Sequence, residues 1–203
     1  MLPLVPEIPF MSKTNLLNIL RTNKTVFTFK DLMLFSGETN LQLLKRQVSY
    51  YTKTKSFYHI RRGIYAKDKN YNRFELATKI YTPSYISFET VLTTAGIIFQ
   101  YYQQIFIASY LSRKIVCDEQ AYSYKKIKPT VLIDNAGIEN KENYAIASAE
   151  RAFLDTVYLY KEYHFDDLSS LNWDNVFAIL PIYNNKSMTR KINKYYEFRS
   201  SQT

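Results

Sequence analysis

The sequence is poor in cysteine, histidine and glycine. Of its 203 residues, one is a cysteine (Cys117), two are histidines (His59 and His164) and four are glycines. A single cysteine excludes an internal disulfide framework, and together with two histidines it cannot form an ordinary closed zinc site. The Gly-rich motifs G-x-G-x-x-G and G-x-x-x-x-G-K-[ST] do not occur, which excludes nucleotide-binding loops of those two kinds. We therefore expect no cofactor and no resident metal.

Long apolar runs are also missing. No stretch of about 18 apolar residues occurs, so no transmembrane helix is expected. The start of the chain, 1–11, carries three prolines and no basic segment, which predicts an extended leader and neither a signal peptide nor a helix. The lack of disulfides is compatible with a reducing compartment. The sequence thus favours a cytoplasmic protein with no membrane partner.

An excess of positive charge is present, and it is concentrated in the first third of the chain. The whole chain has 27 Lys/Arg and 18 Asp/Glu, a net charge of +9. Residues 1–69 hold 12 and 4 of these, a net charge of +8, and residues 70–203 hold 15 and 14, a net charge of +1. A small basic domain followed by a nearly neutral larger one is typical of a nucleic-acid-binding protein with a second function. A basic surface that serves solubility is the alternative.

Residues 12–69 have the pattern of three helices and a hairpin. The first helix follows the leader. The second is predicted at about 28–36, because Thr28 and Asp31 have capping-box spacing and Gly37 is a good C-terminal stop. Only one residue separates this glycine from the start of the third helix, which predicts a tight turn between the two.

The third helix is predicted to begin at Thr39, with Gln42 at the T-x-x-Q capping spacing, and to end near Tyr51. Its core face is expected to consist of apolar residues three and four apart: Leu41, Leu44, Val48 and Tyr51. Two short strands within 57–66 follow, joined by a basic turn. This order of elements predicts a winged helix-turn-helix domain over residues 12–69.

In a winged helix-turn-helix the third helix enters the major groove, where its exposed residues meet base edges and phosphates. Segment 39–69 contains eight Lys/Arg and one acidic residue, which suits phosphate contacts. We expect DNA contacts from the polar face of the third helix, the segment after it and the hairpin turn. These residues are Thr39, Asn40, Gln42, Lys45, Arg46, Ser49, Lys53, Lys55, Arg61 and Arg62. A solvated basic face without a ligand is the alternative.

Residues 70–203 are predicted to form a mixed α+β domain, joined to the first by a polar linker at 67–71. Its helices are expected at about 72–80, 87–96, 149–162, 173–181 and 186–198, the second capped by Ser87 and the third by Ser148. Its β-like stretches are expected at 105–108, 131–133 and 144–146. The predicted fold class is therefore α+β: an N-terminal winged helix-turn-helix followed by a mixed α+β domain.

Three blocks of this sequence resemble the AbiEi family of antitoxins from abortive-infection systems. The first is the hairpin end Arg61–Ala66 (RRGIYA). The second is Pro83–Leu92 (PSYISFETVL), closed by Gly96, and the third is Ser148–Asp155 (SAERAFLD). Their order and spacing carry the resemblance, which covers roughly 12–198.

The resemblance implies a winged-helix domain that binds an operator upstream of its own gene, expected to be an inverted repeat. It also implies an AbiEi-like C-terminal domain that neutralises a nucleotidyltransferase-like toxin without needing a stable complex with it. The expected function is a non-enzymatic DNA-binding antitoxin and transcriptional autorepressor. A stand-alone winged-helix regulator, or a protein-interaction module without a toxin partner, is the alternative.

Two enzymatic interpretations are weaker. Glu139 and Lys141 have the E-x-K spacing of a metal-dependent nuclease strand, but they lie in a polar stretch that predicts a loop. Cys117 has no histidine near it in the sequence, so a buried thiol is expected there rather than a nucleophile.

Overall fold

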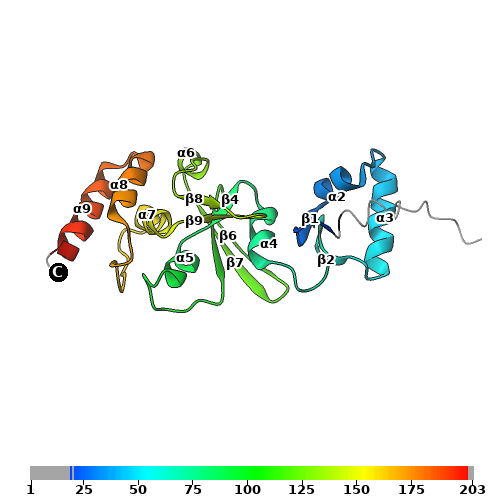
Figure 1. Ribbon diagram of the computed structural model, residues 1–203, viewed down its shortest axis with the longest axis horizontal. Helices are drawn as coiled ribbons and strands as arrows, with labels where there is room; N and C mark the ends of the chain where they lie inside the picture. The colour runs from blue at the N-terminus through cyan, green and yellow to red at the C-terminus, as the bar shows by residue number, and fades with distance from the viewer. Residues whose placement is uncertain (1–18, 20, 201–203) are drawn as a thin grey trace, which may run out of the picture. The chain divides into compact units, whose positions relative to one another are not determined.

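The computed structural model describes Ile19 and residues 21–200 (Figure 1). This part of the chain contains eight α-helices, one 3-10 helix and two sheets, which confirms the α+β class predicted for the chain. The predicted leader 1–11 and most of the first predicted helix lie outside the described residues. The chain divides into two compact units between Lys79 and Ile80, and each is described below by itself.

The described part of the first unit contains a three-stranded sheet and the helices α2, α3 and α4. In chain order these elements are β1 (Val26–Thr28), α2 (Phe29–Ser36), α3 (Leu41–Lys53), β2 (Tyr58–Arg61), β3 (Ile64–Ala66) and α4 (Arg73–Ile80). Strand β3 lies between β1 and β2 and is antiparallel to both. The helices and the sheet enclose a core that includes Leu32, Leu44, Val48 and Phe57.

The capping box predicted for the second helix is confirmed. The Thr28 hydroxyl accepts a hydrogen bond from the Asp31 amide, and the Asp31 carboxylate accepts one from the Thr28 amide at 2.9 Å. Gly37 ends the helix in the left-handed conformation, with φ of 66°, where a glycine carries no steric cost. Burial acts to raise the pKa of Asp31, but hydrogen bonds from Thr28 and the charges of Lys79 and Lys24 hold it below its ordinary value.

Two details predicted for the third helix are wrong. Its N-cap is Asn40 rather than Thr39, because the Asn40 side-chain oxygen accepts from the amides of Gln42 and Leu43. Leu41 is 50% exposed and lies outside the core. The buried face consists of Leu44, Gln47, Val48 and Tyr51. Gln47, three residues after Leu44, takes the place that the apolar pattern had assigned to Leu41.

Residues 67–71 are not a free linker. The Tyr71 ring is buried and stacks on Tyr58, with ring centroids 6.3 Å apart. Beyond it, the buried Glu75 carboxylate of α4 accepts hydrogen bonds from the amide and hydroxyl of Thr25, at 2.9 and 2.7 Å. These contacts tie α4 to the start of β1, so the first compact unit extends to Lys79, ten residues past the expected boundary.

The second unit is built on a six-stranded sheet with the order β6-β7-β5-β4-β9-β8. Its strands are β4 (Ser84–Ile86), β5 (Ile105–Ser109), β6 (Arg113–Cys117), β7 (Gln120–Lys126), β8 (Ile138–Asn140) and β9 (Ala145–Ala147). The pairs β5/β7 and β4/β9 are parallel, and the other neighbours are antiparallel. The sequence patterns located β5 and β9 but not β4, β6, β7 or β8, which are short, charged or mixed in composition.

The helices of the second unit are α5 (Glu89–Thr94), α6 (Pro129–Leu132), α7 (Ala149–Leu159), α8 (Trp173–Ile179), a 3-10 helix (Leu180–Tyr183) and α9 (Lys186–Ser200). Helix α7 packs against α5, α8 and β9. Ser148 caps α7 as predicted, since its hydroxyl accepts from the Arg151 amide. The stretch 131–133, predicted as β-like, belongs to α6 and its C-cap, because Pro129 starts a helical turn that buries Val131 and Leu132.

Candidate nucleic-acid interface

Helix α3 presents a row of exposed side chains along one face. The row consists of residues four apart, Leu41, Lys45, Ser49 and Lys53, which lie above one another on a helix. Gln42 and Arg46 are exposed beside the row. No acidic residue occurs within α3. Apart from the apolar Leu41, this face of the helix consists of side chains with hydrogen-bond donors or positive charge, and it points away from the buried residues.

The hairpin formed by β2 and β3 adds a second basic element. Gly63 makes the turn with φ of 75°, a conformation that favours glycine. Arg62 is exposed in the turn, and Arg61, at the end of β2, is half-buried. His59 is exposed on β2 and pairs in register with Tyr65 on β3, so both side chains lie on the same face of the hairpin.

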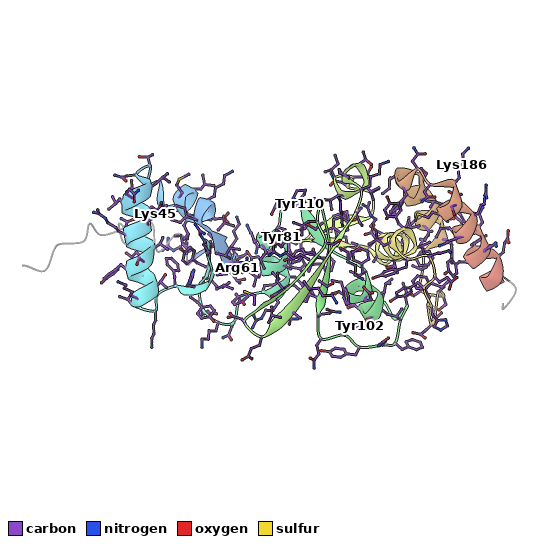
Figure 2. The ribbon with its side chains drawn as sticks, turned by 180° about the vertical axis from the view of Figure 1, so that it is seen from behind. Lys45, Arg61, Tyr81, Tyr102, Tyr110 and Lys186 are labelled. Atoms are coloured by element: carbon purple, nitrogen blue, oxygen red, sulfur yellow. The ribbon has the colours of Figure 1, made fainter. Side chains whose placement is uncertain are left out.

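An open groove of about 500 Å³ lies between α3 and the hairpin. Its lining is contributed by both elements and by the start of α2: Phe29, Lys45, Ser49, Thr52, Lys53, His59, Gly63 and Tyr65. The groove thus brings three of the predicted DNA-contacting residues, Lys45, Ser49 and Lys53, next to the hairpin. Figure 2 labels Lys45 on α3 and Arg61 on the hairpin.

The other predicted contact residues are not part of the groove lining. Gln42 and Arg46 are exposed on α3, and Arg61 and Arg62 belong to the end of the hairpin. Lys55 is exposed in the segment after α3, with φ of 60°.

Thr39 and Asn40 stand apart at the turn before α3. Thr39 lines a different hollow, formed mainly by α2 residues such as Lys30 and Leu34. The Asn40 side-chain oxygen is engaged in capping α3.

Several groove residues were not among the ten predicted DNA-contacting residues. Phe29, Thr52, His59 and Tyr65 join the lining because the chain folds the hairpin back toward α3. The alternation of side chains along β2 and β3 is the sequence signal that could have found His59 and Tyr65, since residues paired across a hairpin share a face. Thr52 has a separate bond, from its hydroxyl to the Val48 carbonyl at 2.8 Å.

The net positive charge of the chain is carried by the first unit. Residues 1–79 hold 14 Lys/Arg and 5 Asp/Glu, a net charge of +9, whereas residues 80–203 hold 13 of each. Two of the five acidic residues are engaged internally, Glu75 with Thr25 and Asp31 with Lys24 and Lys79. Little negative charge is left to oppose the cations of α3 and the hairpin, and such a surface attracts polyanions.

In the second unit, the two sequence blocks that carry the family resemblance meet in a buried network. Arg151 and Asp155 are completely buried, with Nε and Oδ1 3.3 Å apart. The Asp155 carboxylate also accepts from the hydroxyls of Tyr85, Ser87 and Tyr183, at 3.0, 2.8 and 2.6 Å. The prediction that Ser87 caps a helix is therefore wrong: the N-cap of α5 is Phe88, and Ser87 is a buried donor to Asp155.

This network holds the fold together. Arg151 donates to the carbonyl oxygens of Val131 at 2.7 Å and Ala136 at 2.6 Å, which connects α6 and the segment after it to α7. Burial raises the pKa of Asp155, and Arg151 together with the surrounding hydroxyls acts in the opposite direction. Because every member is enclosed, these residues position neighbouring segments and do not face a ligand.

The features that suggested an enzyme lie on the surface or in the core. Glu139 belongs to the edge strand β8, not to a loop as predicted; it is exposed and forms an ion pair with exposed Lys141 at 2.6 Å. Cys117 is buried at the end of β6, as expected. Within Ile19 and residues 21–200, no three His, Cys, Asp or Glu side chains are grouped so that they could hold a metal ion.

No family model and no curated protein matches this chain. The likeness to AbiEi antitoxins thus rests on the three sequence blocks alone. In the described part of the chain, none of the helices combines the length and the apolar character needed to cross a membrane.

Proposed function

We propose that this protein is a DNA-binding regulator whose first unit is a winged helix-turn-helix. The observation that carries the proposal is the groove between α3 and the hairpin, where Lys45, Ser49 and Lys53 face His59 and Gly63. In this proposal α3 is the recognition helix that enters the major groove, and the hairpin is the wing that follows the adjacent backbone. The protein performs no chemistry of its own.

The connectivity of the first unit supports this assignment. Strand β1 leads into α2, Gly37 turns the chain into α3, and the hairpin returns beside β1 to give the strand order β1-β3-β2. The groove brings the hairpin next to Lys45, Ser49 and Lys53 of α3. Gln42, Lys45 and Arg46 are then the candidates for base contacts, and Arg61 and Arg62 for phosphate contacts.

The decisive test compares two double variants of the full chain. Lys45→Ala with Arg46→Ala removes two exposed cations from α3, and Lys186→Ala with Arg190→Ala removes two exposed cations from α9. Binding is measured by fluorescence anisotropy on DNA from upstream of the gene and on random DNA of equal length. Because a good base contact contributes about 1–3 kcal/mol, the α3 variant should bind the upstream DNA at least about tenfold more weakly, and the α9 variant should bind as the parent does.

Circular dichroism confirms that each variant remains folded. Equal weakening by both pairs of substitutions would mean that only net charge matters, as expected for a solvated basic face. If the parent protein does not distinguish upstream from random DNA, the proposal of a sequence-specific regulator is wrong. Binding of an acidic protein in place of DNA would favour the protein-interaction module.

We further propose that the second unit neutralises a nucleotidyltransferase-like toxin. The support is the resemblance to AbiEi antitoxins, together with the meeting of two of its sequence blocks around Asp155. Co-expression with the reading frame immediately downstream of the gene tests this proposal. Growth should be arrested by the downstream protein alone and restored by the full chain, whereas the lack of any arrest would favour a stand-alone regulator.

A further inference from the structure

One exposed apolar residue stands at the beginning of α3. Leu41 is the first residue of this helix and is 50% exposed, although its spacing from Leu44 had suggested a core position. The next three members of its row, Lys45, Ser49 and Lys53, are the α3 residues that line the groove together with Thr52. Leu41 therefore continues the groove-facing row by one turn toward the N-terminus of the helix.

The first turn of a recognition helix is the part that reaches the base edges, while later turns diverge toward the backbone. In the first turn of α3, Asn40 cannot supply its side-chain oxygen to a base, because this atom caps the helix by accepting from the Gln42 and Leu43 amides. Leu43 is half-buried, and Leu44 belongs to the core. Leu41 and Gln42 are the exposed side chains of this turn that take no part in capping the helix.

A leucine side chain has no hydrogen-bonding atom, so it can discriminate bases only through an apolar contact. On the major-groove edges of the four base pairs, the distinctive apolar group is the C5-methyl group of thymine. From the place of Leu41 in the groove-facing row we infer that its side chain reads a thymine methyl group in the bound DNA. Gln42, beside it, has the amide that pairs with adenine N6 and N7, so the two residues together favour an A·T-containing step.

A solitary exposed leucine elsewhere in the unit provides the contrast. Leu34 of α2 is 78% exposed and lines the separate hollow with Lys30 and Thr39, not the groove between α3 and the hairpin. Single exposed apolar residues are ordinary on protein surfaces, so exposure alone says nothing about Leu41. The position of Leu41 in the row of Lys45, Ser49 and Lys53 is what singles it out.

The inference rests on the proposed DNA-binding function, and one experiment tests the two separately. The upstream fragment is synthesised in two forms, one with thymidine triphosphate and one with deoxyuridine triphosphate. The deoxyuridine form lacks every thymine C5-methyl group but keeps all base pairs. The full-chain parent, Leu41→Ala and the matched control Leu34→Ala are titrated against both fragments. Random DNA made in both forms measures any general effect of the methyl groups.

Burying one methyl-sized group contributes about fourfold in affinity. The parent and Leu34→Ala should therefore bind the deoxyuridine fragment at least about fourfold more weakly than the thymidine fragment. Leu41→Ala should bind both fragments equally, with the affinity of the parent for the deoxyuridine form. This loss of discrimination is a double-mutant cycle between a side chain and a DNA methyl group, and a merely structural role of Leu41 would not produce it.

Three results would overturn the inference. If Leu41→Ala weakens binding to both fragments by the same factor, Leu41 acts through the fold or the backbone. If the parent binds both fragments equally, no methyl group is read, while the Lys45/Arg46 variant still decides whether α3 contacts DNA. If Leu41→Ala still discriminates between the two fragments, and analytical ultracentrifugation shows a changed oligomeric state, Leu41 belongs to a protein contact instead.

Discussion

The two units treat charged side chains in opposite ways. The first unit carries the entire net charge of +9, and its α3 exposes cations, Lys45 and Arg46 among them, that no acidic residue of the same helix opposes. The second unit has equal numbers of acidic and basic residues and encloses Arg151 with Asp155 in its core. Exposed cations cost little to maintain in water and are available to a polyanion, whereas a buried pair is committed to the fold.

The contrast teaches that the same residue type has to be interpreted from its surroundings. Arg62, in the hairpin turn, is exposed. Arg151 is completely buried and donates to Asp155, to Tyr85 and to backbone carbonyl groups. Substitution of Arg62 should therefore change DNA affinity, and substitution of Arg151 should change the free energy of unfolding.

The largest effect is expected from Asp155→Ala. Removing one partner of a buried ion pair leaves the Arg151 charge uncompensated and should cost about 3–5 kcal/mol of the free energy of unfolding. Trp173, the chain's only tryptophan, is buried in the second unit, so its fluorescence during urea unfolding reports this unit specifically. Glu139→Ala, which breaks an exposed pair, is the matched control and should leave the unfolding curve nearly unchanged. A parent-like unfolding curve for Asp155→Ala would contradict the structural role of the network.

Separating the two units should separate the two functions. The fragment 80–203 has no net charge and should bind DNA at least about a hundredfold more weakly than the full chain, because it gains little from counterion release. The fragment 1–79 should retain DNA binding. If the DNA has two half-sites that need two linked copies of the protein, the fragment should bind more weakly than the full chain. Anisotropy titrations of both fragments measure the difference. Parental DNA affinity in 80–203, or rescue from the toxin by 1–79 alone, would break the division.

A smaller effect is expected from Arg61→Ala with Arg62→Ala in the hairpin. If these residues bind phosphates, affinity should fall on the order of tenfold for upstream and random DNA alike. The slope of log affinity against log salt should become shallower by about 0.9 for each phosphate that the variant no longer neutralises. Titrations at several salt concentrations check both statements, with Lys186→Ala/Arg190→Ala as control. Weakening confined to upstream DNA would instead assign these arginines to the reading of bases or groove shape.

The smallest effect concerns Asp31 and depends on pH. Its pKa in the folded protein lies below the ordinary value of 3.8, so its ionised form stabilises the fold. This contribution is fully present at neutral pH and is lost as the pH falls through the folded pKa. Asp31→Ala should therefore lose about 1 kcal/mol at neutral pH, and the difference from the parent should shrink in acid. Urea unfolding followed by far-UV circular dichroism measures this stability difference at each pH, with Asp68→Ala as an exposed control. A difference that persists unchanged in acid would contradict the charge-based explanation.

The sequence predicted best where neighbouring residues decide the structure. The capping box of Thr28 and Asp31, the stop at Gly37 and the Ser148 cap depend on groups three residues apart or fewer, and all three are confirmed. The sequence predicted least well where contacts between distant segments decide the structure. Ser87 has the composition of a cap, yet its hydroxyl bonds to Asp155, 68 residues away.

The candidate interface shows the same division. The positions of Lys, Arg, Asp and Glu in the sequence placed the excess positive charge in the first third of the chain. Periodicity placed Lys45 and Ser49 on the polar side of one helix, whereas Lys53 was expected in the segment after it. The exposure of Leu41 followed only from packing, because Gln47 completes the buried face of α3 in its place. The membership of His59 in the groove required the hairpin to fold against α3.

The sequence by itself determined the charge distribution, the α+β class and the local helix signals, since these depend on composition and on contacts within one turn of chain. Tertiary structure decided that α4 belongs to the first unit, through the bond between Glu75 and Thr25, and that Arg151 and Asp155 lie inside a closed network. The physical reason is the low dielectric of a protein interior. A polar group there is stable only if several partners converge on it, and these partners come from segments that the order of residues does not reveal.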